Sequence, residues 1–110
     1  MTENIIIAEY VFIWVEGNNL SADEMTVTGS KALEVAEALT ATTMKILQLL
    51  SKERLDVSTI GVRLDLSEAY ISEQIRVLEE LGLVKVNYER GKRGIRKVCE
   101  TAIKKVTIII

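Results

Sequence analysis

The chain of 110 residues contains no histidine, no proline and a single cysteine, Cys99. A lone cysteine forms no disulfide within a chain, and without histidine too few nitrogen and sulfur ligands remain for a zinc site. Histidine is also the commonest general base, so Ser-His and Cys-His nucleophilic chemistry is excluded. A phosphate-binding glycine loop of known spacing is missing as well. The sequence therefore predicts a protein that is not an enzyme and that uses neither a cofactor nor a metal ion.

Long apolar runs are equally scarce. The stretch Ile5 to Val15 contains Glu9, lacks a basic flank, and is far shorter than the roughly 20 residues of a membrane helix. We therefore expect no membrane contact, and a cytoplasmic location suits the lone thiol. The abundance of Ile, Val, Leu, Glu and Lys resembles the composition of thermophilic proteins, which suggests a thermophilic, archaeal source.

Charge is distributed unevenly along the chain, although the net charge is only −2. Residues 1–83 hold six basic and fourteen acidic side chains, whereas residues 84–110 hold eight basic and two acidic ones. Six of those eight cations lie between Lys85 and Lys97. A concentrated cationic segment on an acidic body is typical of a loop that contacts phosphates. A solubilising charged hairpin would give the same pattern, and the charge alone does not separate the two.

Both ends of the chain have the composition of β-strands. Ile5 to Glu16 predicts a strand that is apolar on both faces, and the turn residues that follow lead toward a returning strand at Met25 to Thr28. Lys104 to Ile110 predicts a terminal strand, which we expect to pair with Ile5 to Val15. We therefore divide the chain into an N-terminal β-hairpin extension, residues 1–29, and a main domain, residues 30–110.

Helical periodicity dominates the middle of the chain. Ser30 is a suitable N-cap for a helix whose apolar stripe is Ala32, Leu33, Val35, Ala36 and Leu39, and further helices are expected over about 42–51 and 57–64. Asp56 or Ser58 caps the third of these, Gly61 permits close helix approach, and Asp65 suits a left-handed turn. Ser67 then starts a fourth helix that ends at Gly82. The two or three residues between the third and fourth helices are the spacing of a helix-turn-helix.

After Gly82 the apolar period changes to two. Val84, Val86 and Tyr88 alternate with polar residues, a glycine-bounded cationic turn follows from Arg90 to Gly94, and Ile95 to Glu100 returns. This pattern predicts a β-hairpin with a cationic tip, which is the wing of a winged helix. The expected fold is α+β, with three to four helices, the wing, an N-terminal hairpin and a C-terminal strand. Cys99 falls in the returning strand and is expected to be a core thiol.

Two segments carry a family likeness. Residues 41–50, ATTMKILQLL, resemble the opening helix of ArsR-type winged helix-turn-helix repressors, and residues 66–84, LSEAYISEQIRVLEELGLV, resemble their recognition helix and its exit into the wing. The likeness covers about Ser30 to Cys99. Ala41, Thr43 and Asp65 depart from the usual proline, arginine and glycine, and the Cys and His positions of the metal-sensing members are missing. The resemblance implies the fold and binding to double-stranded DNA, without metal sensing.

In such a fold the fourth helix enters the major groove and the wing contacts the backbone or the minor groove. The expected DNA-binding residues are Ser67, Glu68, Ala69, Tyr70, Ser72, Glu73, Arg76, Arg90, Lys92, Arg93 and Arg96, with Ser58 as a further phosphate donor. Tyr70 has packing as its alternative role, and Arg76 has an ion pair with Glu73, Glu79 or Glu80.

Two glutamates on a reading helix repel phosphate, so a winged helix that binds another protein and no DNA operator remains the second hypothesis. Self-association as a homodimer is expected, because related repressors pair to read two half-sites. The apolar residues from Ile5 to Val15 also exceed what one small core needs. We expect them and the helix from Ser30 to Thr40 to form the dimer interface.

Overall fold

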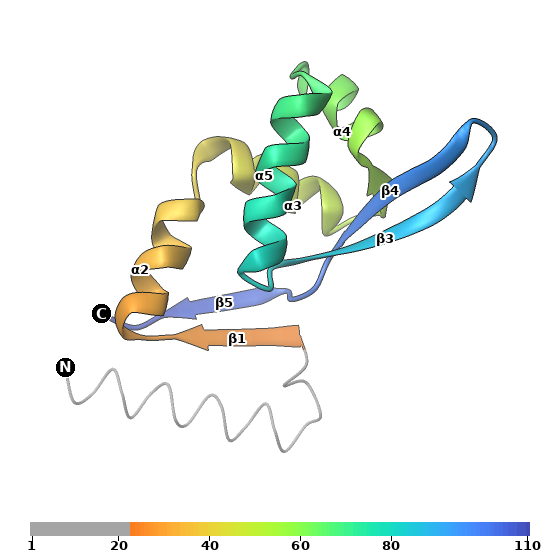
Figure 1. Cartoon of the computed structure of the whole chain (residues 1–110). Helices are drawn as coiled ribbons and strands as arrows, with labels where there is room; N and C mark the ends of the chain where they lie inside the picture. The colour runs from red at the N-terminus through yellow and green to blue at the C-terminus, as the bar shows by residue number, and fades with distance from the viewer. Residues whose placement is uncertain (1–22) are drawn as a thin grey trace. The chain divides into compact units, whose positions relative to one another are not determined.

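The computed structural model describes residues 23–110 (Figure 1). Their contacts divide them into two compact units, one made of residues 23–38 and 103–110 and the other of Leu39–Ala102. Within the described residues there are four helices and a β-hairpin, as the predicted α+β winged helix-turn-helix requires. None of these helices is long and apolar enough to cross a membrane. The expected strand at Ile5 to Glu16, its turn, and hence the N-terminal hairpin lie outside the described residues.

The first unit consists of β1 (Glu24–Val27), α2 (Gly29–Ala38) and β5 (Lys105–Ile108). β1 and β5 pair in parallel (Figure 1), with Glu24 opposite Lys105 and Val27 opposite Ile108. The predicted strands at Met25 to Thr28 and Lys104 to Ile110 are thus confirmed. Their observed ends differ from the predicted ones by one residue at β1 and by up to two residues at β5. The pairing of the terminal strand with Ile5 to Val15 stays a prediction, as does the division at residue 29.

The first helix departs from its predicted start and face. α2 begins at Gly29, whose φ is +60°, so Ser30 lies inside the first turn and does not cap it. Ala32 and Val35 are buried, but Leu33 is 62% exposed. Successive helix positions are about 100° apart, so Leu33 projects away from the line of Ala32 and Val35. The predicted apolar stripe was therefore too wide.

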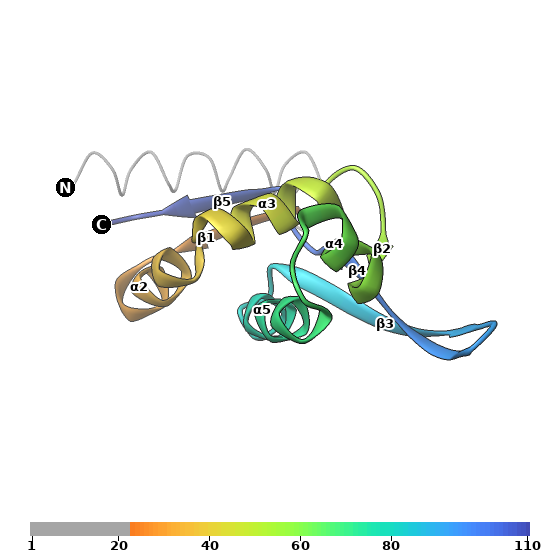
Figure 2. The same ribbon diagram turned by 90° about the horizontal axis from the view of Figure 1, so that it is seen from above.

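The second unit contains α3 (Ala41–Leu50), β2 (Leu55–Asp56), α4 (Val57–Leu64), α5 (Glu68–Glu80), β3 (Val84–Gly91) and β4 (Gly94–Thr101). The strands form an antiparallel sheet in the order β2–β4–β3. The two-residue β2 was missed because a strand of that length has no periodicity to detect. The hairpin of β3 and β4 extends well beyond α4 and α5 (Figures 1 and 2).

A capping box begins α3. The backbone N–H of Thr43 donates to Thr40 Oγ1 at 3.2 Å, and the N–H of Thr40 donates to Thr43 Oγ1 at 2.8 Å. Two of the orphan donors of the helix start are thereby satisfied by a reciprocal pair of side chains. Thr43, which stands where the resembling family has arginine, is 1% exposed and has this capping role instead.

The core of the second unit is assembled from every one of its larger elements. α5 contributes one face of helical spacing, Ile71, Ile75 and Leu78. Met44 of α3 stays outside this core and is 41% exposed. The other buried apolar residues are Ile46, Leu50, Leu55, Val57, Ile60, Leu83, Val84, Val98 and Cys99.

Candidate nucleic-acid interface

The turn between α4 and α5 is held by backbone contacts that need particular residues. Asp65 has φ +57° and ψ +48°, the left-handed conformation that its sequence position predicted. The N–H of Leu66 donates to the carbonyl of Gly61 at 2.9 Å. Asp56 caps α4 by accepting from the N–H of Thr59 at 2.8 Å. These contacts fix where α5 starts, and so fix the residues that its first turns present.

Replacing Gly61 by alanine is expected to destabilise the domain. A Cβ at this position would lie 2.8 Å from the backbone carbonyl oxygen of Leu66, so the turn would have to move. Helix propensity alone would favour alanine by about 1 kcal/mol, whereas overpacking costs about 1–3 kcal/mol. The difference is a net loss of about 0–2 kcal/mol, and we expect a value near the middle of that range in urea denaturation. Ser58→Ala, at an exposed position of α4, is the control, and a stabilised Gly61→Ala would contradict this close approach.

The N-terminal half of α5 presents a polar, accessible surface. Ser67 caps the helix by accepting from the N–H of Tyr70 at 3.1 Å, as predicted. The predicted contact residues thus lie together on the first turns of one helix, although Ser72 is only half-exposed. The exposed ones are Ser67, Glu68, Ala69, Tyr70, Glu73 and Arg76.

Arg76 is held within α5 by two carboxylates. Its guanidinium contacts Glu73, one turn before it, and Glu80, one turn after it, with N–O distances of 2.5 Å in both pairs. The hydrogen bond and charge of Arg76 lower the pKa of Glu73, and the same contacts raise the pKa of Arg76. Glu73 is therefore a carboxylate at neutral pH and can only accept hydrogen bonds. Of the alternative pairings expected for Arg76, those with Glu73 and Glu80 are present, and no salt bridge to Glu79 is found.

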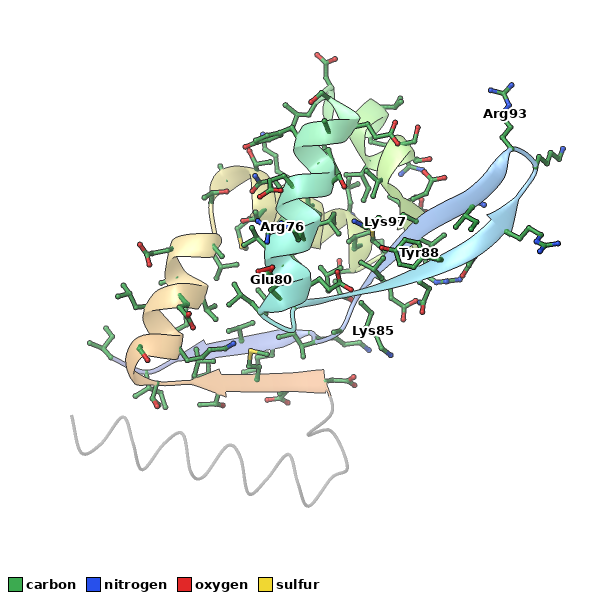
Figure 3. All side chains as sticks on the ribbon, viewed as in Figure 1. Arg76, Glu80, Lys85, Tyr88, Arg93 and Lys97 are labelled. Carbon is green, nitrogen blue, oxygen red and sulfur yellow. The ribbon has the colours of Figure 1, made fainter. Side chains whose placement is uncertain are left out.

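The wing ends in a two-residue turn of Lys92 and Arg93, because Arg90 and the two glycines belong to the strands. Gly91 and Gly94 face each other across the end of the hairpin, and Gly94 has a φ of +117° that side chains rarely adopt. Arg90, Lys92 and Arg93 are exposed, and no salt bridge joins them to any residue that the structure describes. Figure 3 shows Arg93 projecting from the tip. The tip is thus a cluster of unneutralised cations.

Arg96 differs from the other predicted wing cations. Its Nε lies 3.0 Å from Oδ2 of Asp56, and its side chain passes over Gly91, where an added Cβ would lie 2.7 Å from Arg96 Cδ. Arg54 likewise bonds Glu89 and, at 2.7 Å, Glu100. These pairs join the two long strands of the hairpin to the segment that precedes α4. Arg96 is consequently partnered inside the protein.

The double role of Asp56 makes stability depend on pH. The side chain and N–H of Thr59, followed by the guanidinium of Arg96, hold the pKa of Asp56 below its usual value of about 3.9. Asp56 therefore stabilises the fold above that value, and the contribution is lost as the pH falls through the lowered pKa. Asp56→Asn keeps an acceptor for the helix cap but removes the charge. We expect its free energy of unfolding, measured by urea denaturation, to fall less than that of the wild type between pH 5 and about pH 2. Equal losses would contradict the assignment.

Cys99 is fully buried, as expected for a core thiol. Burial raises the pKa of this thiol to about 11, so it is protonated at neutral pH. Within the described residues no three His, Cys, Asp or Glu side chains gather as metal ligands would.

Several residues of this surface were not among the predicted site residues. Tyr88 and Ile95 are 69% and 77% exposed on the wing, and Arg54 ties the hairpin to the rest of the unit. The alternation of β3 marked Tyr88 as an inward-facing position, but the hairpin has already left the core at that point. The sequence does not show how far the two strands extend beyond the helices, and the exposure of Tyr88 depends on that length.

The comparisons with known proteins agree with this geometry. Residues 41–86 match the sequence profile described as "Bacterial regulatory protein, arsR family". No curated protein matches the chain significantly in sequence. Among solved structures, reduced HlyU from Vibrio cholerae is similar with 23% identity and a TM-score of 0.57, over 66% of this chain and 74% of that one.

Two further structures are similar. The transcriptional regulator HlyU from Vibrio vulnificus aligns with 21% identity and a TM-score of 0.56, over 82% of this chain and 80% of its own. Mb0332 from Mycobacterium bovis, described as a homodimeric winged helix-turn-helix DNA-binding domain, aligns with 24% identity and a TM-score of 0.59, over 66% and 65%. At these identities the likeness establishes the fold. The chain thus contains an arsR-type helix-turn-helix segment, residues 41–86, within a winged-helix fold.

Proposed function

We propose that the protein is a transcriptional regulator, not an enzyme, that binds specific sequences of double-stranded DNA in the cytoplasm as a homodimer. The observation that carries this is the cationic tip of the wing, Arg90, Lys92 and Arg93, exposed and without salt bridges to the described residues. Clustered cations without internal partners supply the charge that binding to phosphates requires. The capped, exposed start of α5 in the same unit supplies a helix for the major groove.

In this proposal the two elements have different tasks. Tyr70 and Ser72 hydrogen-bond base edges or phosphates, and Glu73 accepts from the amino group of a cytosine. Arg76 contacts a guanine or a phosphate only if its salt bridge with Glu73 or with Glu80 breaks. Arg90, Lys92 and Arg93 contact the backbone, whereas Arg96 fixes the hairpin through Asp56. Sequence is therefore read by α5, and affinity comes largely from the wing.

The homodimer is supported by the chemistry of DNA and by one similar structure. A single winged helix covers little DNA, and two-fold symmetric sites are read by paired recognition helices about one helical turn apart. Mb0332 is described as homodimeric. The proposed interface includes α2, where Leu33 is 62% exposed, together with the apolar segment from Ile5 to Val15. A mass by light scattering of one chain at micromolar concentration would contradict it.

The acidity of α5 favours the second candidate, a winged helix that binds a protein. Glu68, Glu73, Glu79 and Glu80 outnumber Arg76, the one cation of α5, and carboxylates near phosphates oppose binding. A basic protein surface would suit this helix. The cationic tip is the feature that this candidate leaves without a role.

Selection of binding sites from a pool of random duplexes tests the proposed function. We expect enrichment of a two-fold symmetric sequence with half-sites about ten base pairs apart. Ser72→Ala and Tyr70→Ala should each alter the preferred base at particular positions, because they act on the reading helix. Binding without any enrichment would contradict a specific operator, and absence of binding at low salt would favour the protein-interaction module.

A further inference from the structure

All three nitrogens of the Arg76 guanidinium donate to carboxylates of the same helix. Nε and Nη2 donate to Oε2 and Oε1 of Glu73, at 3.2 and 2.5 Å, and Nη1 donates to Glu80 at 2.5 Å. We call these three residues the α5 cluster, and Figure 3 shows Arg76 and Glu80 following each other along α5. Arg76 therefore contacts both oxygens of Glu73, a bidentate geometry that is stronger and more directional than a single hydrogen bond.

The geometry of the α5 cluster restricts the Glu73 carboxylate. An exposed ion pair ordinarily adds little to stability, but bidentate arginine–carboxylate pairs and networks of several charges are the exceptions. The cluster is both, and its residues are spaced by three and four positions, so they share one side of the helix. Glu73 thus has a defined orientation and a compensated charge, although its side chain is 55% exposed.

The Glu73 carboxylate can still accept further hydrogen bonds. An ionised carboxylate has about four lone-pair sites, and Arg76 occupies one on each oxygen. The donor that suits the remaining sites is an amino group with no acceptor beside it. In the major groove cytosine presents only an amino group, whereas adenine places the acceptor N7 beside its amino group. The chemistry of the oriented carboxylate therefore favours cytosine.

We propose that Arg76 is a positioning residue, which stays paired with Glu73 in the complex with DNA and orients that carboxylate toward the amino group of a cytosine. This inference rests on the proposed function, and it assigns the preference for cytosine to the pair instead of to Glu73 alone. A carboxylate without a counter-charge is repelled by phosphates. Arg76 reduces that repulsion, and Glu80 holds the guanidinium from the next turn.

Removal of Arg76 should therefore act at the base position that Glu73 contacts. We expect the wild type to prefer cytosine about tenfold at one position of each half-site, as a good base contact does. Glu73→Ala and Arg76→Ala should each reduce this preference to about twofold or less, at the same position. The double variant should show no greater loss than Glu73→Ala, because the two residues act as a unit.

Arg76→Lys separates orientation from charge. Lysine keeps the positive charge, but its ammonium is a point charge that does not match the two oxygens of a carboxylate. We expect Arg76→Lys to bind random duplex within about twofold of the wild type, since charge dominates that binding, yet to lose most of the cytosine preference. A role of Arg76 that depended on charge alone would leave the preference intact. Glu79→Ala, at an exposed position of α5 outside the cluster, is the control and should keep it.

The experiment first selects sites from random duplexes with the full chain. Fluorescence anisotropy then measures the affinity of each variant for the selected duplex and for duplexes that carry the other bases at the cytosine position. Circular dichroism checks that each variant is folded. Should Arg76→Ala fail to fold, Arg76→Lys decides alone.

Each outcome decides the inference. Loss of the cytosine preference in the Arg76 variants, at the position that Glu73→Ala affects, supports it. A preference that Arg76→Lys retains, a loss at a different position, or the lack of any position that depends on Glu73 overturns it, while the enriched site keeps the proposed function standing. If the wild type enriches no site, the proposed function fails, and the inference fails with it.

Discussion

Ile75→Ala is expected to remove about 3–4 kcal/mol from the free energy of unfolding, the largest loss of stability that we predict. Ile75 lies in the middle of the buried face of α5 and is fully inaccessible to solvent. The substitution deletes buried methyl and methylene groups and leaves a cavity, because densely packed neighbours relax only in part. A domain of this size is stable by about 5–15 kcal/mol, so the loss is a large fraction of the total.

Urea denaturation followed by circular dichroism measures this loss. Glu79→Ala, at an exposed position of the same helix, is the control and should change stability by no more than about 0.5 kcal/mol. Folding of α5 against the rest of the second unit depends on the inward face that Ile75 occupies. A change below about 1 kcal/mol in Ile75→Ala would contradict the packing of α5 described above.

Replacing Arg90, Lys92 and Arg93 together by alanine is expected to weaken duplex binding about 100-fold near physiological salt. None of the three forms a salt bridge with a described residue, so no internal ion pair is lost and the change falls on DNA contacts. If each cation neutralises one phosphate, the slope of log K against log salt falls by about three. Anisotropy titrations at several salt concentrations measure both quantities.

Lys31, Lys45 and Lys104, all exposed and outside the wing, provide the matched control. Their triple replacement by alanine changes the net charge by the same amount, so it reports the effect of overall charge alone. We expect it to weaken binding by less than about tenfold. Equal losses in the two triple variants would mean that the wing has no special part in binding.

The helix-turn-helix was predictable because its signals are local. Asp56, Asp65 and Ser67 each act on backbone groups within a few residues, and the sequence alone placed α4 at its observed bounds. Such caps and turns need no knowledge of the rest of the fold. The reading surface of α5 follows directly, since the periodicity of Ile71, Ile75 and Leu78 determines which residues face outward.

The partners of the charged residues were less predictable. Arg96 lies 40 positions from Asp56, and Arg54 lies 35 positions from Glu89, so only the assembled sheet brings them together. The same holds for the parallel pairing of β1 with β5. Strand composition marks a strand but not its partner or direction. The distinction between the tip cations and Arg96 therefore required the structure.

The most direct test of the central claim is an NMR titration of the ¹⁵N-labelled protein with duplex DNA. If the proposed interface is correct, the amide signals of Ser67 to Arg76 and of Tyr88 to Lys97 shift most, and they shift together along one binding curve. Signals of the buried α3 residues Ile46 and Leu50 should move little. Shifts confined to residues outside α5 and the wing, or no shifts at low salt, would contradict the account.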